Sequence, residues 1–153
     1  MNSLKEQDAY FMRLALEEAG LAYSEDEVPV GALLVIEDKI TAKAHNCREG
    51  SNDPAGHAEI IALRAGARSI NSWRLTGATL YVTKEPCIMC AGAMINARLG
   101  RLVYGCKDSK GGAAGSLYNI LSDTRLNHQT EVVSGVLEDE CSLILKRFFF
   151  SRR

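Results

Sequence analysis

The chain has 153 residues and a net charge of only −1, and 46% of its residues are hydrophobic while 24% are charged. These values are typical of a globular protein with one buried core, so a single domain over residues 1–153 is expected. No apolar run approaches the roughly 20 residues of a membrane span, and the polar start of the chain lacks the pattern of a secretion signal. The sequence therefore predicts a cytoplasmic protein with no membrane partner.

Hydrophobic periodicity and turn signals predict helices that alternate with strands. The first helix begins at Ser3, which has capping-box spacing to Glu6, and it is expected to end before Gly20. In chain order, the first expected elements are a helix over 3–19, strands over 30–36 and 40–45, and a helix over 57–70. The later elements are a strand over 78–83, a helix over 87–97, a strand over 102–104, a short helix over 117–121, a strand over 131–136 and a helix from 137 onward. This order predicts an α/β fold, in which a mixed five-stranded sheet has helices on both faces.

Charge is unevenly distributed along the chain. The first 28 residues contain seven acids and two bases, whereas the segment from Lys146 to Arg153 contains four bases and no acid. This asymmetry permits nucleic-acid binding, although ordinary solvated faces explain it equally well.

The cysteines indicate a metal site rather than a disulfide framework, because their number, five, is odd and no secretion signal precedes them. Cys87 and Cys90 form a Pro-Cys-x-x-Cys motif at the start of a predicted helix, and His57 opens another. Two converging helix starts would bring one imidazole and two thiols together. Three protein ligands leave one position of a tetrahedral zinc ion open, which is typical of catalytic zinc.

Glu59 is predicted to be the catalytic residue beside this zinc. Zinc lowers the pKa of a bound water to about 7 and so provides hydroxide near neutral pH. Glu59 follows His57 by two residues. The negative charge nearby should raise the pKa of its carboxyl group, which suits a group that accepts and later donates a proton.

Two other uses of these residues remain open. A redox Cys-x-x-Cys pair leaves His57 and Glu59 without a role. A structural zinc site requires a fourth ligand, for which the candidates are Cys47, Cys106 and His45. The combination of His-x-Glu with a downstream Pro-Cys-x-x-Cys favours catalysis, because it is the pattern of zinc-dependent nucleobase deaminases.

The chain resembles bacterial tRNA-specific adenosine deaminases over nearly its whole length. The matching segments are EVPVGALLV (27–35), HAEIIALR (57–64), ATLYVTKEPCIMCAGAMINARLGRLVYG (78–105), GGAAGSLYNIL (111–121) and NHQTEVVSGVL (127–137). The resemblance implies a three-layer α/β/α sandwich of the cytidine-deaminase type, one Zn²⁺ per chain, no nucleotide cofactor and a homodimer. It also implies hydrolytic conversion of adenosine to inosine at the wobble position of a tRNA anticodon stem-loop. In that reaction zinc-bound hydroxide would attack adenine C6, and Glu59 would carry the proton.

The same resemblance assigns substrate contacts to further residues. Asn46, Val30 and the backbone N–H of Ala58 match positions around the target base. Contacts with ribose, phosphates and the RNA groove are implied for Asp108, Lys110, Phe149 and Arg152. Each also has a purely structural interpretation, such as a turn cap for Asn46.

Two residues depart from the family pattern: Lys84 stands where an apolar residue is common, and Cys106 where a small residue is common. Neither belongs to the predicted zinc-binding set. Two alternative functions share the motif. A deaminase of a free base or nucleoside, of the guanine, cytosine or adenine type, would have the same core, whereas a non-catalytic zinc RNA-binding protein would supply four protein ligands.

Overall fold

The computed structural model of the chain describes residues 3–152 and contains one mixed five-stranded sheet, with strand order β2-β1-β3-β4-β5. Strand β1 is antiparallel to both of its neighbours, whereas β3, β4 and β5 are parallel. The strands are β1 (Gly31–Ile36), β2 (Lys39–His45), β3 (Ala78–Lys84), β4 (Arg101–Cys106) and β5 (Glu131–Val133). The helices are α1 (Leu4–Ser24), α2 (Ala58–Ile70), α3 (Ile88–Asn96), α4 (Glu138–Phe150) and the short 3₁₀ helix η1 (Ile120–Ser122). Among residues 3–152, no helix combines the length and the apolar character needed to cross a membrane.

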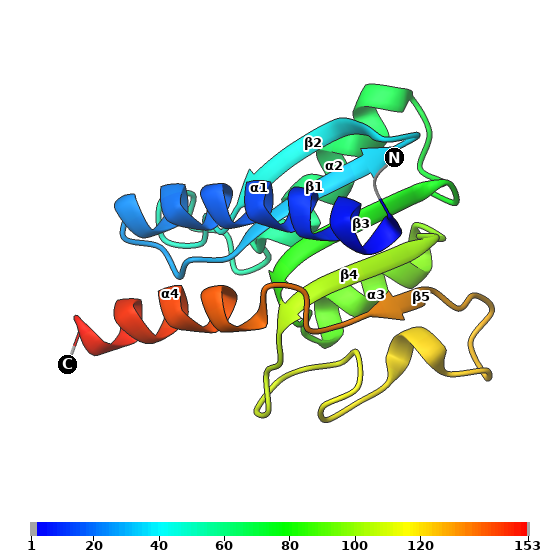
Figure 1. Cartoon of the computed structure of the whole chain (residues 1–153). Helices are drawn as coiled ribbons and strands as arrows, with labels where there is room; N and C mark the ends of the chain where they lie inside the picture. The colour runs from blue at the N-terminus through cyan, green and yellow to red at the C-terminus, as the bar shows by residue number, and fades with distance from the viewer. Residues whose placement is uncertain (1–2, 153) are drawn as a thin grey trace.

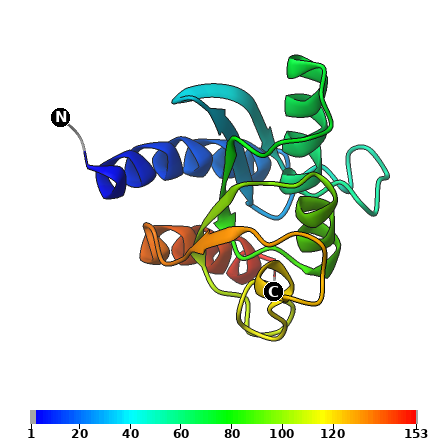
Figure 2. The ribbon, with the colours of Figure 1, turned by 90° about the vertical axis from the view of Figure 1, so that its right-hand side faces the viewer.

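Helices cover both faces of the sheet. Helices α1 and α4 lie on one face, and α2 and α3 lie on the other (Figure 1, Figure 2). The central strands are buried between these layers, because both of their faces carry aliphatic side chains: Leu33, Leu34, Leu80 and Val82 have no exposed surface. The predicted three-layer α/β/α sandwich is therefore confirmed.

Helix α1 is longer than the sequence predicts. Ser3 caps its first turn as expected, but the helix passes through Gly20 and ends at Ser24. Ala19 and Ala22 on either side of this glycine are fully buried. Their packing outweighs the roughly 1 kcal/mol that a glycine costs inside a helix, so the predicted stop is wrong.

Two predicted elements in the second half of the chain are also wrong in extent. Residues 117 and 118 form no helix, because their N–H groups donate to the carbonyl of Gly112 and close a tight loop; only η1 is helical. The strand expected over 131–136 ends at Val133. Gly135, with φ of +81°, turns the chain there toward α4.

The segments predicted to be functional lie together at one end of the strands. Gly31 at the start of β1 pairs with His45 at the end of β2, and Lys84 at the end of β3 pairs with Cys106 at the end of β4. The segments that follow β2, β3 and β4 therefore leave the sheet at the same edge. These segments contain the motifs on which the sequence-based prediction of function depends.

A buried ion pair fixes α1 to the sheet. Asp8 is only 3% exposed and accepts hydrogen bonds from Arg101 Nη1 and Nη2 at 2.8 and 2.7 Å and from the Tyr81 hydroxyl at 2.8 Å. Burial, together with this carboxylate, raises the pKa of Tyr81 far above its usual value. Three hydrogen bonds that involve charged groups make Asp8 a strong structural anchor.

Candidate active site

Three potential metal ligands meet at the first turns of α2 and α3. His57 is the N-cap residue of α2, Cys87 is the N-cap residue of α3, and Cys90 lies in the first turn of α3. The Nδ1 atom of His57 lies 3.6 Å from Cys87 Sγ and 3.5 Å from Cys90 Sγ, and the three ligand atoms all lie within 4.8 Å of one another. The two helix starts thus converge on one point.

The spacing of these atoms fits a tetrahedral zinc ion. For Zn–S bonds of about 2.3 Å, Zn–N bonds of about 2.05 Å and tetrahedral angles, sulfur and nitrogen should lie about 3.6 Å apart, close to both measured distances. In the part of the chain that the structure describes, Cys47, Cys106 and His45 do not belong to the group. The set therefore offers three protein ligands and leaves one coordination position for water or substrate.

Cys87 is prepared to act as a thiolate. A hydrogen bond with Cys90, together with the one to His57, holds the pKa of the Cys87 thiol well below its usual value. Its place at a helix N-terminus adds partial positive charge. The same hydrogen bond, with burial, raises the pKa of Cys90, so Cys87 is the thiol that carries the negative charge, and Cys90 must lose its proton when a metal binds.

Glu59 lies in the first turn of α2 and is only 4% exposed. Burial raises the pKa of its carboxyl group to about 7. The raised pKa that the sequence predicts is therefore present, but its main cause is burial rather than the neighbouring negative charge. A carboxyl group with this pKa can exchange a proton near neutral pH, as a general acid–base catalyst must.

A cavity of about 320 Å³ connects these residues with several of the predicted substrate contacts. It is lined by Val28, Val30, Asn46, Arg48, His57, Glu59, Lys84, Glu85, Cys87, Asp108 and Phe149. Four residues with predicted substrate contacts thus share one cavity with two of the three potential metal ligands, His57 and Cys87. These four are Val30, Asn46, Asp108 and Phe149. Phe149 reaches it from α4, which follows the metal motif by many residues.

Asn46, which lines this cavity, is hydrogen-bonded to Ala58. The Ala58 backbone N–H donates to Asn46 Oδ1 at 3.0 Å, and both residues are buried. The Ala58 N–H, which was expected to bind the substrate, therefore donates its hydrogen bond to the Asn46 side chain in this structure. Asn46 fixes the start of α2, next to His57, and a substrate contact with Ala58 requires this bond to open.

Lys110 and Arg152 do not line the cavity. Lys110 is exposed, and its backbone N–H donates to Asp108 Oδ1 at 3.0 Å. Arg152 forms an ion pair with Asp26, and its guanidinium carbon lies 3.5 Å from the centre of the Phe148 ring. Arg152 instead lines a neighbouring cavity of about 610 Å³, which shares Asn46 with the first.

Comparisons with known proteins identify the family. The family described as MafB19-like deaminase matches residues 6–153. The tRNA-specific adenosine deaminase of Bacillus subtilis (strain 168) is 50% identical over 143 residues, which cover 94% of this chain and 89% of the relative. The protein of the same name from Haemophilus influenzae is 50% identical over 149 residues, which cover 97% and 86%. The chain belongs to the tRNA-specific adenosine deaminase family.

A solved structure agrees with this assignment. It comes from studies of A-to-I editing by tRNA:A34 deaminases at the wobble position of transfer RNA, and it matches with a TM-score of 0.86 and 45% sequence identity. The match covers 89% of this chain and 99% of that one. The resemblance to tRNA-specific adenosine deaminases that the sequence motifs indicated is therefore confirmed.

In this member of the tRNA-specific adenosine deaminase family, two buried carboxylates hold the loops beside the site. Glu27 is 3% exposed, and its oxygens accept the three consecutive N–H groups of residues 48–50 at 2.8 to 3.2 Å. Glu85 is 2% exposed and accepts the N–H groups of Asp108, Ala114 and Ser116 at 3.0 to 3.1 Å. Both were missed in the sequence analysis, although Glu85 directly precedes the Pro-Cys-x-x-Cys motif.

These hydrogen bonds determine the charge of both groups. Burial on its own would raise the pKa of each carboxyl group, but the hydrogen bonds from the loops outweigh burial and lower both pKa values. Glu27 and Glu85 therefore carry full negative charge at neutral pH, and each attracts the loop that surrounds it.

Arg48 and Lys84 add positive charge to the cavity wall, and neither was predicted to contact substrate. Lys84 Nζ lies 3.4 Å from Asp108 Oδ2. Cys106, the other departure from the family pattern, is the neighbour of Lys84 in the sheet but does not line the cavity. Of the two departures, Lys84 is thus the one that changes the cavity.

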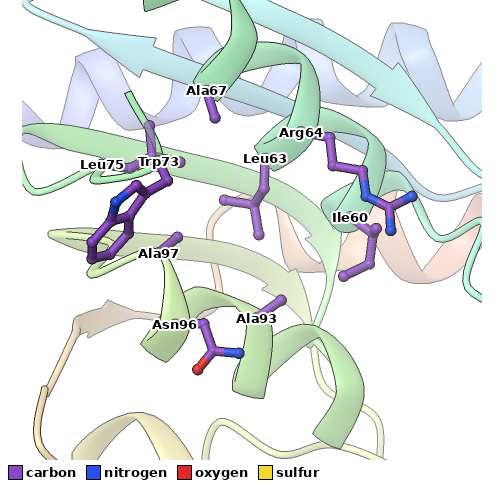
Figure 3. A pocket seen from close by; sticks show the side chains of 9 residues that line it. All are labelled: Ile60, Leu63, Arg64, Ala67, Trp73, Leu75, Ala93, Asn96 and Ala97. Atoms are coloured by element: carbon purple, nitrogen blue, oxygen red, sulfur yellow. The ribbon is translucent and has the colours of Figure 1, made fainter. Parts of the chain in front are cut away.

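Another cavity, of about 430 Å³, lies between α2 and α3, apart from the two cavities described above (Figure 3). In this view Leu63 of α2 points toward Ala93 of α3, and the exposed Trp73 forms one end (Figure 3). It contains no group of metal-binding residues, within the described range. This cavity is therefore not a candidate for the catalytic site.

Proposed function

We propose that this chain converts adenosine to inosine by hydrolysis at the wobble position of a tRNA anticodon loop. The observation that carries the proposal is a single cavity lined by Glu59 and by two members of the three-ligand group, His57 and Cys87. The curated relatives that are 50% identical, both named tRNA-specific adenosine deaminase, support this choice of substrate.

His57, Cys87 and Cys90 would hold Zn²⁺, because their donor set and spacing fit that ion. When bound, zinc acidifies a water molecule and makes it a nucleophile near neutral pH. The protein contributes the orientation of the ligands: the two helix starts fix His57 and Cys87, and Asn46 fixes the first of these starts through its bond to Ala58.

Glu59 would move the protons of the reaction. Water adds to adenine C6, and Glu59 takes a proton from this water and transfers it to ring nitrogen N1. Glu59 then carries the proton of the new C6 hydroxyl to the amino nitrogen, so that the C6–N bond breaks, ammonia leaves and the C6=O bond of inosine forms. A carboxyl group with a pKa of about 7 suits both directions of transfer, which typically contribute a hundred- to ten-thousand-fold in rate.

The cavity accommodates one base rather than a duplex. Val30, Asn46 and Phe149 would surround the base, and Asp108 would face its sugar. Lys110 and Arg152, outside the cavity, would meet the flanking RNA. An anticodon loop is a suitable substrate, because its bases are already partly unstacked and one can be turned out at a cost of about a few kcal/mol.

We also propose that the chain acts as a single deaminase domain, in a homodimer, in the cytoplasm. Exposed apolar residues lie beside two cavities on the α2–α3 side, namely Trp73, Ile88, Met89 and Leu126. Such a surface suits a second copy of the chain. The five cysteines are free, which is the usual state in a reducing compartment.

The decisive experiment is to incubate the zinc-loaded protein with an RNA anticodon stem-loop that has adenosine at the wobble position. Nucleosides from the digested RNA are then separated, and inosine is quantified. We expect inosine with the wild type, and at least about a hundredfold less with Glu59→Gln, which keeps the size of the side chain but not its acid–base chemistry.

Parallel reactions contain free adenosine, guanine and cytosine. Turnover of one of these compounds without turnover of the stem-loop would replace the proposal with a free-base or nucleoside deaminase. No turnover of any substrate by a fully zinc-loaded protein would favour the non-catalytic RNA-binding alternative.

A further inference from the structure

Residues 107–116 form a loop, termed the wall, that brings Asp108 into the lining of the active-site cavity. It is glycine-rich and lacks regular structure except for one isolated bridge. A loop of this composition should be mobile on its own. The structure instead gives it a defined path, with Asp108 placed in the cavity wall. Part of this path is fixed inside the loop, because the Asp108 carboxylate accepts the N–H groups of Lys110 and Gly111, but other N–H groups of the loop are bound from outside it.

The Glu85 carboxylate is the group that holds it. Its Oε1 atom accepts the Asp108 N–H and the Ser116 hydroxyl, and its Oε2 atom accepts the N–H groups of Ala114 and Ser116. Four donors from one loop thus satisfy a single side chain that is only 2% exposed. Hydrogen bonds to a buried charge are among the strongest in proteins.

The loop is shaped to surround this carboxylate. A Cβ atom added at Gly112 would lie 2.3 Å from Glu85 Cδ, so only glycine lets the backbone pass this closely. The Ala113 N–H also donates to the carbonyl of Pro86 at 2.8 Å, directly before Cys87. The wall is thus attached to the same short segment that leads into the metal-ligand helix.

We propose that Glu85 is a positioning residue, whose buried carboxylate fixes residues 107–116 as a preformed wall of the active-site cavity and thereby sets the affinity for RNA. If the wall is preformed, substrate binding does not have to order it. The link to RNA affinity rests on the proposed function, whereas the ordering of the loop does not depend on it.

The test variant is Glu85→Gln, which has the same size but replaces one acceptor oxygen with an NH₂ group. In place of Oε2, that NH₂ group would face two backbone N–H donors; in place of Oε1, it would face the Asp108 N–H and the Ser116 hydroxyl, which can turn to accept. At least one hydrogen bond from a backbone N–H is therefore lost in either orientation. We expect KM for the anticodon stem-loop to rise about tenfold while kcat changes by less than about threefold, because the hydrogen bonds of the Glu85 side chain run to the loop and not to Glu59 or the metal ligands. Zinc content should equal that of the wild type.

A second measurement does not depend on activity. Lys107 and Lys110 provide trypsin sites inside the wall, and cleavage there should be at least about fivefold faster in Glu85→Gln than in the wild type. Gly112→Ala, which crowds the carboxylate without changing any charge, should give the same pattern. If the wild type fails to deaminate RNA, the proposed function is wrong, and trypsin still tests the position of the wall.

The matched control is Asp8→Asn, which removes the charge of another buried and multiply hydrogen-bonded carboxylate, remote from the cavity. It should lower the melting temperature but leave KM and the rate of cleavage at the two lysines unchanged. The proposal is overturned if Glu85→Gln changes neither KM nor cleavage, or if Asp8→Asn changes both to the same extent, since Glu85 would then only support the fold.

Discussion

Cys90 illustrates how much depends on single residues at this site. It is fully buried, and its Sγ lies 3.5 Å from His57 Nδ1. We expect Cys90→Ala to abolish stoichiometric zinc binding, because two protein ligands remain where a catalytic site needs three. Metal content per chain after dialysis, measured by mass spectrometry, checks this.

The matched control for Cys90→Ala is Cys47→Ser. Cys47 is half-buried and lies between Asn46 and Arg48, which line the active-site cavity, but it is outside the group of potential metal ligands. This variant should retain one zinc ion per chain. Loss of zinc from Cys47→Ser would reveal a fourth protein ligand and would support a structural zinc site.

At the residue scale, the sequence reveals the candidate metal-binding and catalytic residues more readily than the buried acids that hold the neighbouring loops. His57, Glu59 and Cys87 are detectable because local spacing places each of them at or near a helix start. Glu27 and Glu85 follow no such rule. Each becomes meaningful only when a loop more than twenty residues away along the chain brings its N–H groups to the carboxylate. The hydrogen-bond partners of such buried acids are backbone N–H groups that are distant in the sequence, so no local sequence pattern indicates them.

The same limit applies to the predicted substrate contacts. Val30 and Phe149 come from opposite ends of the chain, and only the fold brings them into one cavity. Arg152 illustrates the reverse case, because in the structure it pairs with Asp26 instead of lining that cavity.

At the scale of secondary-structure elements, glycines decide how closely helices can approach the sheet. Gly66 lies in α2, and a Cβ atom added there would lie 2.1 Å from Leu34 Cδ2, in the fully buried centre of β1. We expect Gly66→Ala to lower the free energy of unfolding by about 1–3 kcal/mol, because overpacking outweighs the gain in helix propensity. Urea unfolding measures this change.

Gly20 provides the opposite case within a helix. A Cβ atom added there would meet nothing within 4 Å, so Gly20→Ala should raise the free energy of unfolding by about 0.5–1 kcal/mol. If both alanine variants were stabilising, the contact between α2 and β1 would be looser than the structure indicates.

The elements with strong hydrophobic periodicity were predicted well, and those fixed by tertiary contacts were not. Helix α2 and strand β3 each differ from the prediction by a single residue at one end. Helix α1 continues beyond Gly20 because core packing supports its last turn, which no propensity reveals. The N–H groups of residues 117 and 118 donate to the carbonyl of Gly112, five and six residues earlier, in a tight loop that helical periodicity does not reveal.

At the scale of the whole molecule, one histidine makes stability depend on pH. His45 Nδ1 lies 3.2 Å from Glu18 Oε1, and its Nε2 lies 2.9 Å from Glu25 Oε1, so the ring joins the end of β2 to α1. Burial alone would lower the pKa of His45, but the two glutamates outweigh it and raise the pKa above its usual 6.5. The protonated ring is therefore the form that stabilises the fold.

The sign of the effect follows from this shift. The contribution of His45 is fully present below about pH 6.5, where the unfolded chain is also protonated, and it is lost as the pH rises through the folded-state pKa. We expect the difference in the free energy of unfolding between wild type and His45→Gln to shrink between about pH 6 and about pH 9. Urea unfolding of both proteins at several pH values measures it, and a constant difference would show that the pKa of His45 is the same in the folded and the unfolded chain.

The arrangement of the cavity also has a consequence for the order in which the site is completed during synthesis. The metal ligands are all present once Cys90 has been made, but the cavity wall requires Asp108 from the loop after β4 and Phe149 from α4. Because a chain is synthesised from its N-terminus, the residues for metal loading become available before those that enclose a substrate. The cavity can therefore be complete only after α4 has left the ribosome, which makes enclosure of the substrate the last feature of the site to form.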